Sequence, residues 1–320
     1  MPDVNINAPI AAQQAGSTEP PEPRVPRVER EFTVVEKSQW QQAGRRFVRH
    51  RIAMVSSVVF IVLLLFAFVG PYFWQFPYNK FSNNLSDLNA GPSLRHPFGT
   101  DNLGYDGLAV VMRGTQQSLK IALSIALLAV VVGSIWGVVS GYFLGFVDSV
   151  LMRFADLVLT IPALALAAAL AHNTTGSWWV IALVLGGLST PYVARVVRGT
   201  VLSLREREFI EASRALGASN TRIMFRHLIP NALAVIIVNA TLLVAAGILS
   251  ETALSYLGFG VRAPDTSLGL LISVAQGAVD TRPWLFYFPG IFIILIALTV
   301  NFIGDGLRDA LDPRQTRQRR

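Results

Sequence analysis

The sequence predicts an all-α, polytopic membrane protein with about six transmembrane helices. The chain has 320 residues, of which 52% are hydrophobic and only 15% charged, whereas a soluble domain carries about 25% charged residues. Several apolar runs are long enough, at ~1.5 Å per helical residue, to cross the ~30 Å core of a bilayer. The basic residues gather in 24–51, 195–226 and 308–320, and six spans place these three stretches on one side of the membrane.

The predicted spans are uncharged or nearly uncharged runs. The first two contain no charged residue, whereas the third is the least clean because Arg153 and Asp156 lie near its start. The six runs are 52–72, 121–143, 150–171, 177–194, 230–250 and 283–304. Because the number of spans is even, the N- and C-termini are expected on the same side.

Charge sets the predicted orientation. Membrane proteins keep basic residues on the cytoplasmic side, so both termini are predicted to be cytoplasmic. All but six of the 27 Lys and Arg residues then lie inside, the six being Lys80, Arg95, Arg113, Lys120, Arg262 and Arg282. The net charge of +7 is therefore attributed to topology, and no nucleic-acid partner is expected.

Three regions divide the chain. Residues 1–44 are predicted to be a disordered cytoplasmic tail with an amphipathic lead-in, because their prolines and polar residues offer no core to bury. Residues 45–313 form the membrane domain, and 314–320 are a basic C-terminal tail. The first apolar run begins after about fifty residues, so no cleavable signal is predicted.

The residues that carry common chemistry are absent or scattered. There is no cysteine, which excludes disulfides and thiolate metal sites. Lysine occurs only at positions 37, 80 and 120, so the chain has no phosphate-binding loop of the Gly-x-x-x-x-Gly-Lys type. The four histidines, at 50, 96, 172 and 227, show no metal-ligand spacing. We expect no catalytic residue, no metal and no cofactor.

A motif lies in the predicted external loop, 73–117. Its sequence, residues 96–106, is His-Pro-Phe-Gly-Thr-Asp-Asn-Leu-Gly-Tyr-Asp. It resembles a motif of the C-type permease subunits of ABC importers for dipeptides, oligopeptides and nickel, in which Arg stands at Tyr105 and Leu at Phe98. Asp101 and Asp106 are interpreted either as turn-forming residues or as contacts for a binding protein. The motif positions are His96, Gly99, Thr100, Asp101, Gly104 and Asp106.

Glycines recur every fourth residue in the second predicted span, at Gly133, Gly137, Gly141 and Gly145. This spacing places them on one helix face, where the missing side chains let another helix approach closely. Static packing is the favoured interpretation, and the alternative is a seam that slides during transport.

A polar segment, 199–230, separates two apolar runs. It is predicted to form a short helix, a break at Gly217 and a second short helix capped by Ser219 or Asn220. It resembles the EAA loop of ABC-importer permeases, which implies docking onto a cytoplasmic ATPase subunit; the alternative is an amphipathic helix on the membrane surface. The positions that carry the resemblance or the segment's shape are Glu211, Ala212, Ser213, Gly217, Ile223, His227 and Pro230.

One carboxylate follows the fifth apolar run. Glu251 opens a stretch, 251–260, that is similar to a second motif of the same permease family, and 304–313 resembles the family's ending. A charged side chain at the bilayer centre costs about 2.5–3.5 kcal/mol on insertion scales. Glu251 is therefore predicted either to line the translocation path or to lie solvated near the outer interface.

The resemblance implies a type I ABC-importer permease fold in a bacterial plasma membrane. It implies that this non-catalytic chain forms half of a path for peptides with a related B-type permease. It also implies cytoplasmic ATP-binding subunits, an extracytoplasmic solute-binding protein and surrounding membrane lipid. A path for nickel or another small solute is the first alternative. An ion-coupled carrier acting alone is less favoured, because no internal repeat is visible.

Overall fold

The computed structural model describes residues 39–172 and 176–311, so most of the predicted disordered tail and the basic tail lie outside the described residues. Regular structure in the described part is helical, apart from one isolated bridge between Thr100 and Asp106. The helices are α1 Gln39–Arg49, α2 Arg51–Phe68, α3 Gly70–Phe73, η1 Leu85–Asp87, α4 Gly107–Phe143, α5 Gly145–Thr160, α6 Ala163–Ala171, α7 Trp178–Arg205, α8 Glu208–Ala215, α9 Asn220–Ile223, η2 Met224–Leu228, α10 Ile229–Tyr256, α11 Leu268–Ala275, η3 Gln276–Ala278 and α12 Trp284–Leu311.

The fold class and the number of spans agree with the sequence prediction. Five helices in the described part are long and apolar enough to cross a membrane, and α5 with α6 makes a sixth if the pair is one span. The predicted third span, 150–171, is not a single helix, because α5 and α6 meet at 86°. Ile161 is extended, with ψ of 135°, directly before Pro162. A proline pushes the residue before it out of the helical region, so this dipeptide explains the break.

Helix α4 begins at Gly107, inside the predicted external loop 73–117 and well before the predicted span. The Asp106 carboxylate caps the helix by accepting a hydrogen bond from the Ala109 amide at 2.8 Å. Arg113, in the second turn of α4, is neutralised by an acid of the same chain. Its guanidinium donates to the two carboxylate oxygens of Asp265, at 2.9 and 3.0 Å. The predicted span begins at 121, where the charged residues stop. Helix α4 is longer, because a helix can extend beyond the apolar core of the membrane.

Glycines bring α4 and α7 into close contact. A β-carbon at Gly137 would lie 2.5 Å from the backbone carbonyl oxygen of Ala194, which is closer than real β-carbons approach. Gly133 and Gly141 meet valine side chains of α7 at 2.7 and 2.9 Å in the same way. We call Gly133, Gly137 and Gly141 the glycine seam. The seam is a contact between two helices of this chain, α4 and α7.

Gly145, the fourth glycine of the predicted series, lies apart from the seam. A β-carbon there would meet nothing within 4 Å. Helix α4 ends at Phe143. The next residue, Leu144, has φ and ψ of 55° and −162°, which a residue with a β-carbon rarely adopts, and Gly145 follows with φ of +57°. Gly145 therefore serves the sharp connection into α5 and not helix packing.

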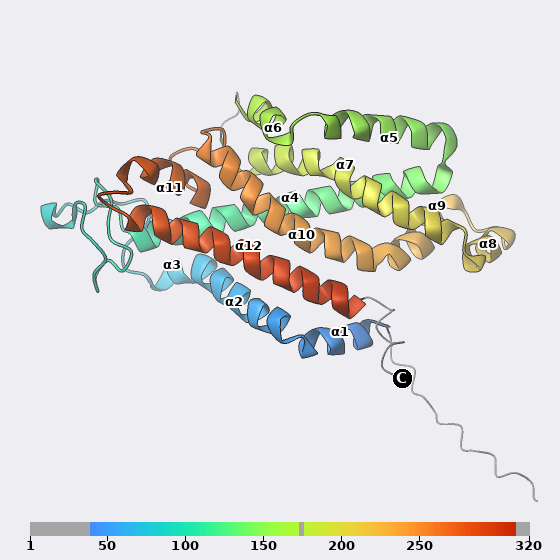
Figure 1. Cartoon of the computed structure of the whole chain (residues 1–320), viewed down its shortest axis with the longest axis horizontal. Coiled ribbons are helices and arrows are strands. Elements are labelled where there is room, and N and C mark those ends of the chain that lie inside the picture. Colours follow the sequence, from blue (N-terminus) through green and yellow to red (C-terminus); the bar gives the residue numbers. More distant parts are fainter. Residues whose placement is uncertain (1–38, 173–175, 312–320) are drawn as a thin grey trace, which may run out of the picture. The chain divides into compact units, whose positions relative to one another are not determined.

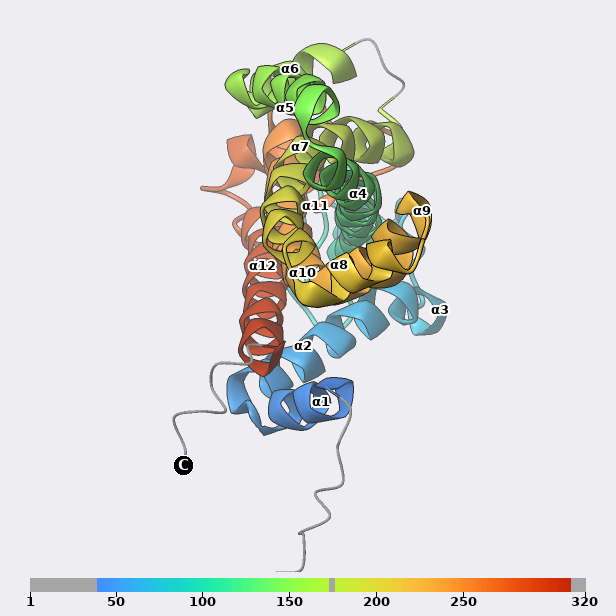
Figure 2. The same cartoon turned by 90° about the vertical axis from the view of Figure 1, so that its right-hand side faces the viewer.

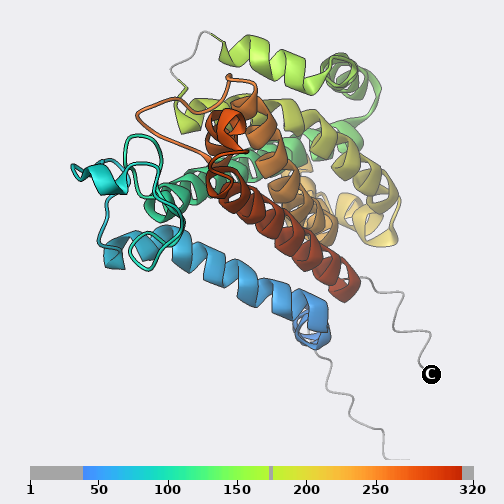
Figure 3. The same cartoon turned by 60° about the vertical axis from the view of Figure 1, so that its left-hand side comes forward.

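The ends of the long helices carry two different structures. Figure 1 shows α8 and α9 at one end of α4, α7 and α10, and the loop between α3 and α4 together with α11 at the other. Figure 3 shows α2 running along α12. The two motifs found in the sequence, in 199–230 and 96–106, are thus displayed at opposite ends of the helices.

Candidate functional site

Helix α8 is anchored by one residue and otherwise exposed. The side chain of Ile210 is fully buried in the hydrophobic core, whereas Glu211, Ala212 and Leu216 are exposed. The Ser213 hydroxyl is bonded within the helix, because it donates to the Phe209 carbonyl at 2.7 Å. A short helix held at one point presents its remaining surface outward.

The break after α8 has the local geometry that the sequence predicts. Gly217 has φ of +78°, and the space around it is open. Only the backbone conformation therefore requires glycine here. Ser219 caps the next helix, since its hydroxyl accepts a hydrogen bond from the Arg222 amide at 3.3 Å.

The second short helix of the prediction is α9, but no break separates it from the next span. It continues through η2 into α10, so residues from Asn220 to Tyr256 form one continuous helix of 37 residues. It passes Pro230 because a wide turn, η2, precedes the proline, and the Ile229 amide bonds to the Met224 carbonyl five residues back. A proline ring collides with the carbonyl four residues before it in a regular α-helix, and the wider turn relieves that collision.

The structure also divides the predicted coupling residues by exposure. Ile223 is fully buried in the core, and His227 is half-buried within η2, while Pro230 is exposed. Ile223 thus holds the segment in place and offers no surface to a partner. The exposed set of Glu211, Ala212, Leu216 and Gly217 is named the α8 face below.

A polar contact missed by the sequence analysis ties the end of α4 to this segment. The Tyr142 hydroxyl donates to Asn220 at 2.7 Å, and the Arg214 guanidinium lies 5.2 Å from the centre of the Tyr142 ring. Tyr142 is buried, so its hydroxyl needs a partner. The tyrosine follows an apolar span, and nothing local in the sequence points to its partner 78 residues away.

The outer-loop motif is organised around a buried carboxylate. Asp106 lies 2.7 Å from Nδ1 of His96 and accepts a hydrogen bond from Nε1 of Trp74 at 2.9 Å. A carboxylate accepts but does not donate, so the proton of this pair lies on Nδ1. Asp106 therefore joins the chain after α2, the motif and the first turn of α4.

The other motif residues shape the loop. Asp101 accepts from the backbone amides of Leu103 and Tyr105, at 2.9 and 2.8 Å, which makes it a turn residue. Gly99 and Gly104 have φ of +68° and +81°, and a β-carbon at Gly99 would lie 2.6 Å from the indole of Trp284. Thr100 is fully buried, and its hydroxyl accepts from the Ala90 amide at 2.9 Å.

A second acid, Asp87, stabilises the loop and was not predicted. The Ser82 hydroxyl donates to it at 2.6 Å and lowers the pKa of this carboxyl below its ordinary value of 3.8; burial opposes that effect and the charge of Arg95 adds to it. The lowered pKa stabilises the fold above pH 3.8, and this contribution is lost as the pH falls through the folded-state value.

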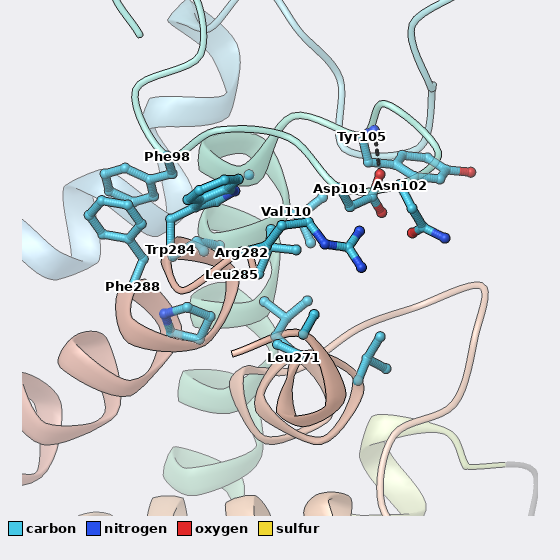
Figure 4. Close-up of a pocket in the computed structure, with 16 residues that line it drawn as sticks. Phe98, Asp101, Asn102, Tyr105, Val110, Leu271, Arg282, Trp284, Leu285 and Phe288 are labelled. Carbon is cyan, nitrogen blue, oxygen red and sulfur yellow. Dashed lines mark hydrogen bonds between the residues drawn. The ribbon is translucent and has the colours of Figure 1, made fainter. Parts of the chain in front are cut away.

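A cavity of about 120 Å³ lies between the loop, α11 and the start of α12 (Figure 4). Phe98 stacks on Phe288 with ring centres 3.9 Å apart, and Trp284 and Arg282 lie beside them. Tyr105, which stands where the resembling motif has Arg, lines the same cavity.

Glu251 is fully buried and reaches no exposed surface of the chain. Its two oxygens accept from Ser118 on α4 at 2.9 Å and from Ser255 at 2.7 Å. The Ser118 hydroxyl accepts in turn from the Leu268 amide of α11 at 3.1 Å. In this conformation Glu251 is shielded from solvent, against the second of the two predictions, and it joins α4, α10 and α11.

Replacing Asp106 with alanine is expected to loosen the outer loop. Trp74, His96 and the Ala109 amide all lose their acceptor, and a helix cap alone contributes about 1 kcal/mol. We expect faster tryptic cleavage after Arg95, with chain still present in the membrane. Asp101→Ala is the matched comparison, because it removes bonds within one turn only. Equal cleavage in Asp106→Ala and the unchanged protein would contradict the central role of Asp106.

Known protein families match most of the chain. Residues 129–317 match the family described as binding-protein-dependent transport system inner membrane component. Residues 38–92 match the N-terminal transmembrane domain of oligopeptide transport permease C.

Curated relatives match over nearly their whole length. The chain is 41% identical to the oligopeptide transport system permease protein OppC of Mycobacterium tuberculosis, over 86% of this chain and 95% of the relative. It is 37% identical to OppC of Bacillus subtilis, over 87% and 90%. It is 36% identical to the dipeptide transport system permease protein DppC of Alkalihalophilus pseudofirmus, over 92% and 95%.

A solved structure shares the fold. An inward-facing structure of the MetNI methionine ABC transporter aligns with a TM-score of 0.53 at 20% identity, covering 63% of this chain and 96% of the other. The shared fold agrees with the helical architecture described above. The chain therefore belongs to the family of binding-protein-dependent transport system inner membrane components, in the branch of the C-type permeases.

Proposed function

We propose that the chain is one of two permease subunits of an ATP-driven importer that carries peptides across a bacterial plasma membrane. The relatives named above are oligopeptide and dipeptide permeases, and they match over at least 90% of their lengths. A related B-type permease would supply the other half of the path. A solute-binding protein would deliver the peptide from outside.

The exposed α8 face is the observation that carries the coupling part of this proposal. Helix α8 is short and fixed at Ile210, and it presents Glu211, Ala212 and Leu216 outward. It lies in a stretch rich in arginine, which favours the cytoplasmic side. A cytoplasmic ATP-binding subunit would receive this face, and both chain termini would lie on the same side.

The connections of α8 suggest how motion is passed on. Helix α7 ends at Arg205, only two residues before α8, and the long helix that includes α10 begins at Asn220. A displacement of α8 would act on both helices at once. ATP binding would then favour one of two arrangements of the path through differential contacts at the α8 face.

Gly217→Val tests the coupling role. Valine is strained at positive φ, so the connection between α8 and α9 should be distorted while the membrane helices stay in place. We expect an unchanged amount of chain in the membrane, less ATP-binding subunit recovered per permease, and fewer labelled peptides moved per ATP hydrolysed. Ala212→Trp, which adds bulk to the exposed face, should act in the same way.

Gly217→Asn is the matched control, because asparagine tolerates the left-handed conformation. It should retain most docking and uptake. If valine and tryptophan variants keep normal ratios of ATPase recovery and of transport to hydrolysis, α8 is not the coupling element. Peptide uptake by the unchanged complex tests the substrate class separately.

A further inference from the structure

Helix α5 is poorly packed against the rest of the chain. Of its 16 residues only Ala155 is buried. In Figures 1 and 2 it lies with α6 beside α7, on the side away from α2 and α12. Burial of apolar side chains is the main source of packing stability, and α5 obtains little of it from its own chain.

Two ion pairs hold α5 instead, and both run to α7. The Arg198 guanidinium donates to both oxygens of Asp148, each at 2.6 Å, and Arg195 pairs with Asp156. The Ser140 hydroxyl at the end of α4 also donates to Asp148. Asp148 is 14% exposed, so the first pair is largely shielded from solvent. Both acids thus belong to α5 and both bases to α7.

Backbone breaks free α5 at its two ends. At the first end, Leu144 and Gly145 have positive φ, and the space around Gly145 is open. At the other end the extended Ile161 and Pro162 produce the 86° bend into α6. A helix between two such breaks can change its direction without unwinding.

Helix α7, in contrast, is firmly placed. The glycine seam brings its backbone against α4, and the Arg198 amide lies where a Gly137 β-carbon would meet it at 2.9 Å. Arg198 stands seven residues before the end of α7 at Arg205, which is ~10 Å of helix. The basic ends of both ion pairs are therefore carried by the helix that leads directly into α8.

We propose that the pairs Asp148–Arg198 and Asp156–Arg195 form a latch through which α5 follows α7 during transport. The inference rests on the importer function proposed above. The four residues act as positioning residues: they contact no substrate but make α5 a moving part of the path. Movement of α8 then reaches α5 through α7 and the latch.

The test uses the complete transporter, reconstituted with its partner permease, ATP-binding subunits and solute-binding protein. The chain lacks cysteine, so spin labels can be placed at introduced cysteines replacing Val150 on α5 and Leu242 on α10, both exposed. The distance between them is measured without nucleotide and with trapped ATP. Uptake of labelled short peptides and ATP hydrolysis are measured on the same preparations.

The unchanged latch should give an ATP-dependent change in the α5–α10 distance. Asp148→Asn with Asp156→Asn should abolish that change and lower uptake per complex by about tenfold, while ATP hydrolysis continues. A tenfold loss is a coupling of ~1.4 kcal/mol, within the range for residues of one ion-pair network. The exchange Asp148→Arg with Arg198→Asp should restore the distance change and most of the uptake.

Arg153→Gln is the matched control. Arg153 lies on α5 and forms no ion pair within 39–172 and 176–311. It should transport normally. If the double Asn variant keeps the distance change and the uptake, the latch is wrong.

Two further outcomes are separated by the design. If the double variant fails to assemble, Asp156→Asn alone decides, because that pair is half-exposed and an exposed ion pair contributes little to folding; a full distance change and full uptake there would overturn the latch. If the unchanged complex and Arg153→Gln move no peptide, the proposed function fails, and the distance measurement still reports on the latch.

Discussion

Gly137→Leu is expected to separate α4 from α7 and to prevent stable folding of the chain in the membrane. The new β-carbon would meet the carbonyl oxygen of Ala194 at 2.5 Å and the amide of Arg198 at 2.9 Å. These are backbone atoms and cannot rotate away, so the helices must move apart. Overpacking of a core costs typically 1–3 kcal/mol, and we expect the upper part of that range or more. The measurement is thermal unfolding of purified chain in detergent.

Gly187→Leu is the control for this prediction. Gly187 lies on α7, the helix that packs against Gly137 of α4, but a β-carbon there would meet nothing within 4 Å. It should leave the unfolding temperature almost unchanged. Because the seam lies within the chain, the Gly137 defect should appear before any partner binds. Equal stability of the two leucine variants would show that the close contact between α4 and α7 is not needed.

Glu251→Ala is expected to remove most of the folded chain from the membrane. The hydroxyls of Ser118 and Ser255 would lose their acceptor in a buried site. Each buried unsatisfied donor costs ~1–3 kcal/mol, and the total stability of a protein is commonly ~5–15 kcal/mol. Two lost bonds and the vacated volume therefore take a large share of it. The readout is the amount of folded chain, together with peptide uptake per folded chain.

Glu251→Gln should retain much of the fold, because one carbonyl oxygen still accepts a serine hydroxyl. Thr252→Ala is the matched control, since its buried hydroxyl has no hydrogen-bond partner in the described part of the chain. The result that would contradict this view is a Glu251→Ala chain present in normal amount with altered uptake. That outcome would return Glu251 to the path-lining role considered from the sequence.

Local rules predicted what depends on local sequence. Charge and hydropathy predicted the spans, the glycine at the end of a short helical pattern predicted the turn at Gly217, and Ser219 has the side chain of a helix cap. The same rules placed helix ends poorly where the helix and the apolar run do not have the same boundaries. Gly107 begins a helix ahead of its apolar stretch, and Pro162 interrupts one inside it.

Long-range partners could not be predicted from one sequence. The hydrogen bond from Ser118 to Glu251 spans 133 residues, and that from Arg198 to Asp148 spans 50. Hydropathy shows that a helix is in the membrane but not which neighbour each face meets. For this reason the sequence predicts that Glu251 faces a path or water, whereas in the structure three helices enclose it.

The order of synthesis gives the ion pairs of α5 another consequence. Asp148 and Asp156 emerge from the ribosome before Arg195 and Arg198 are made. An aspartate without a partner is disfavoured inside a bilayer, by about 2.5–3.5 kcal/mol at the centre on insertion scales and by less near the surface. Until α7 has been synthesised, the nascent α5 is therefore expected to stay at the membrane surface or within the insertion machinery. Insertion of α5 into the bilayer is then a late step, which becomes favourable only when the two arginines of α7 are available to pair with its aspartates.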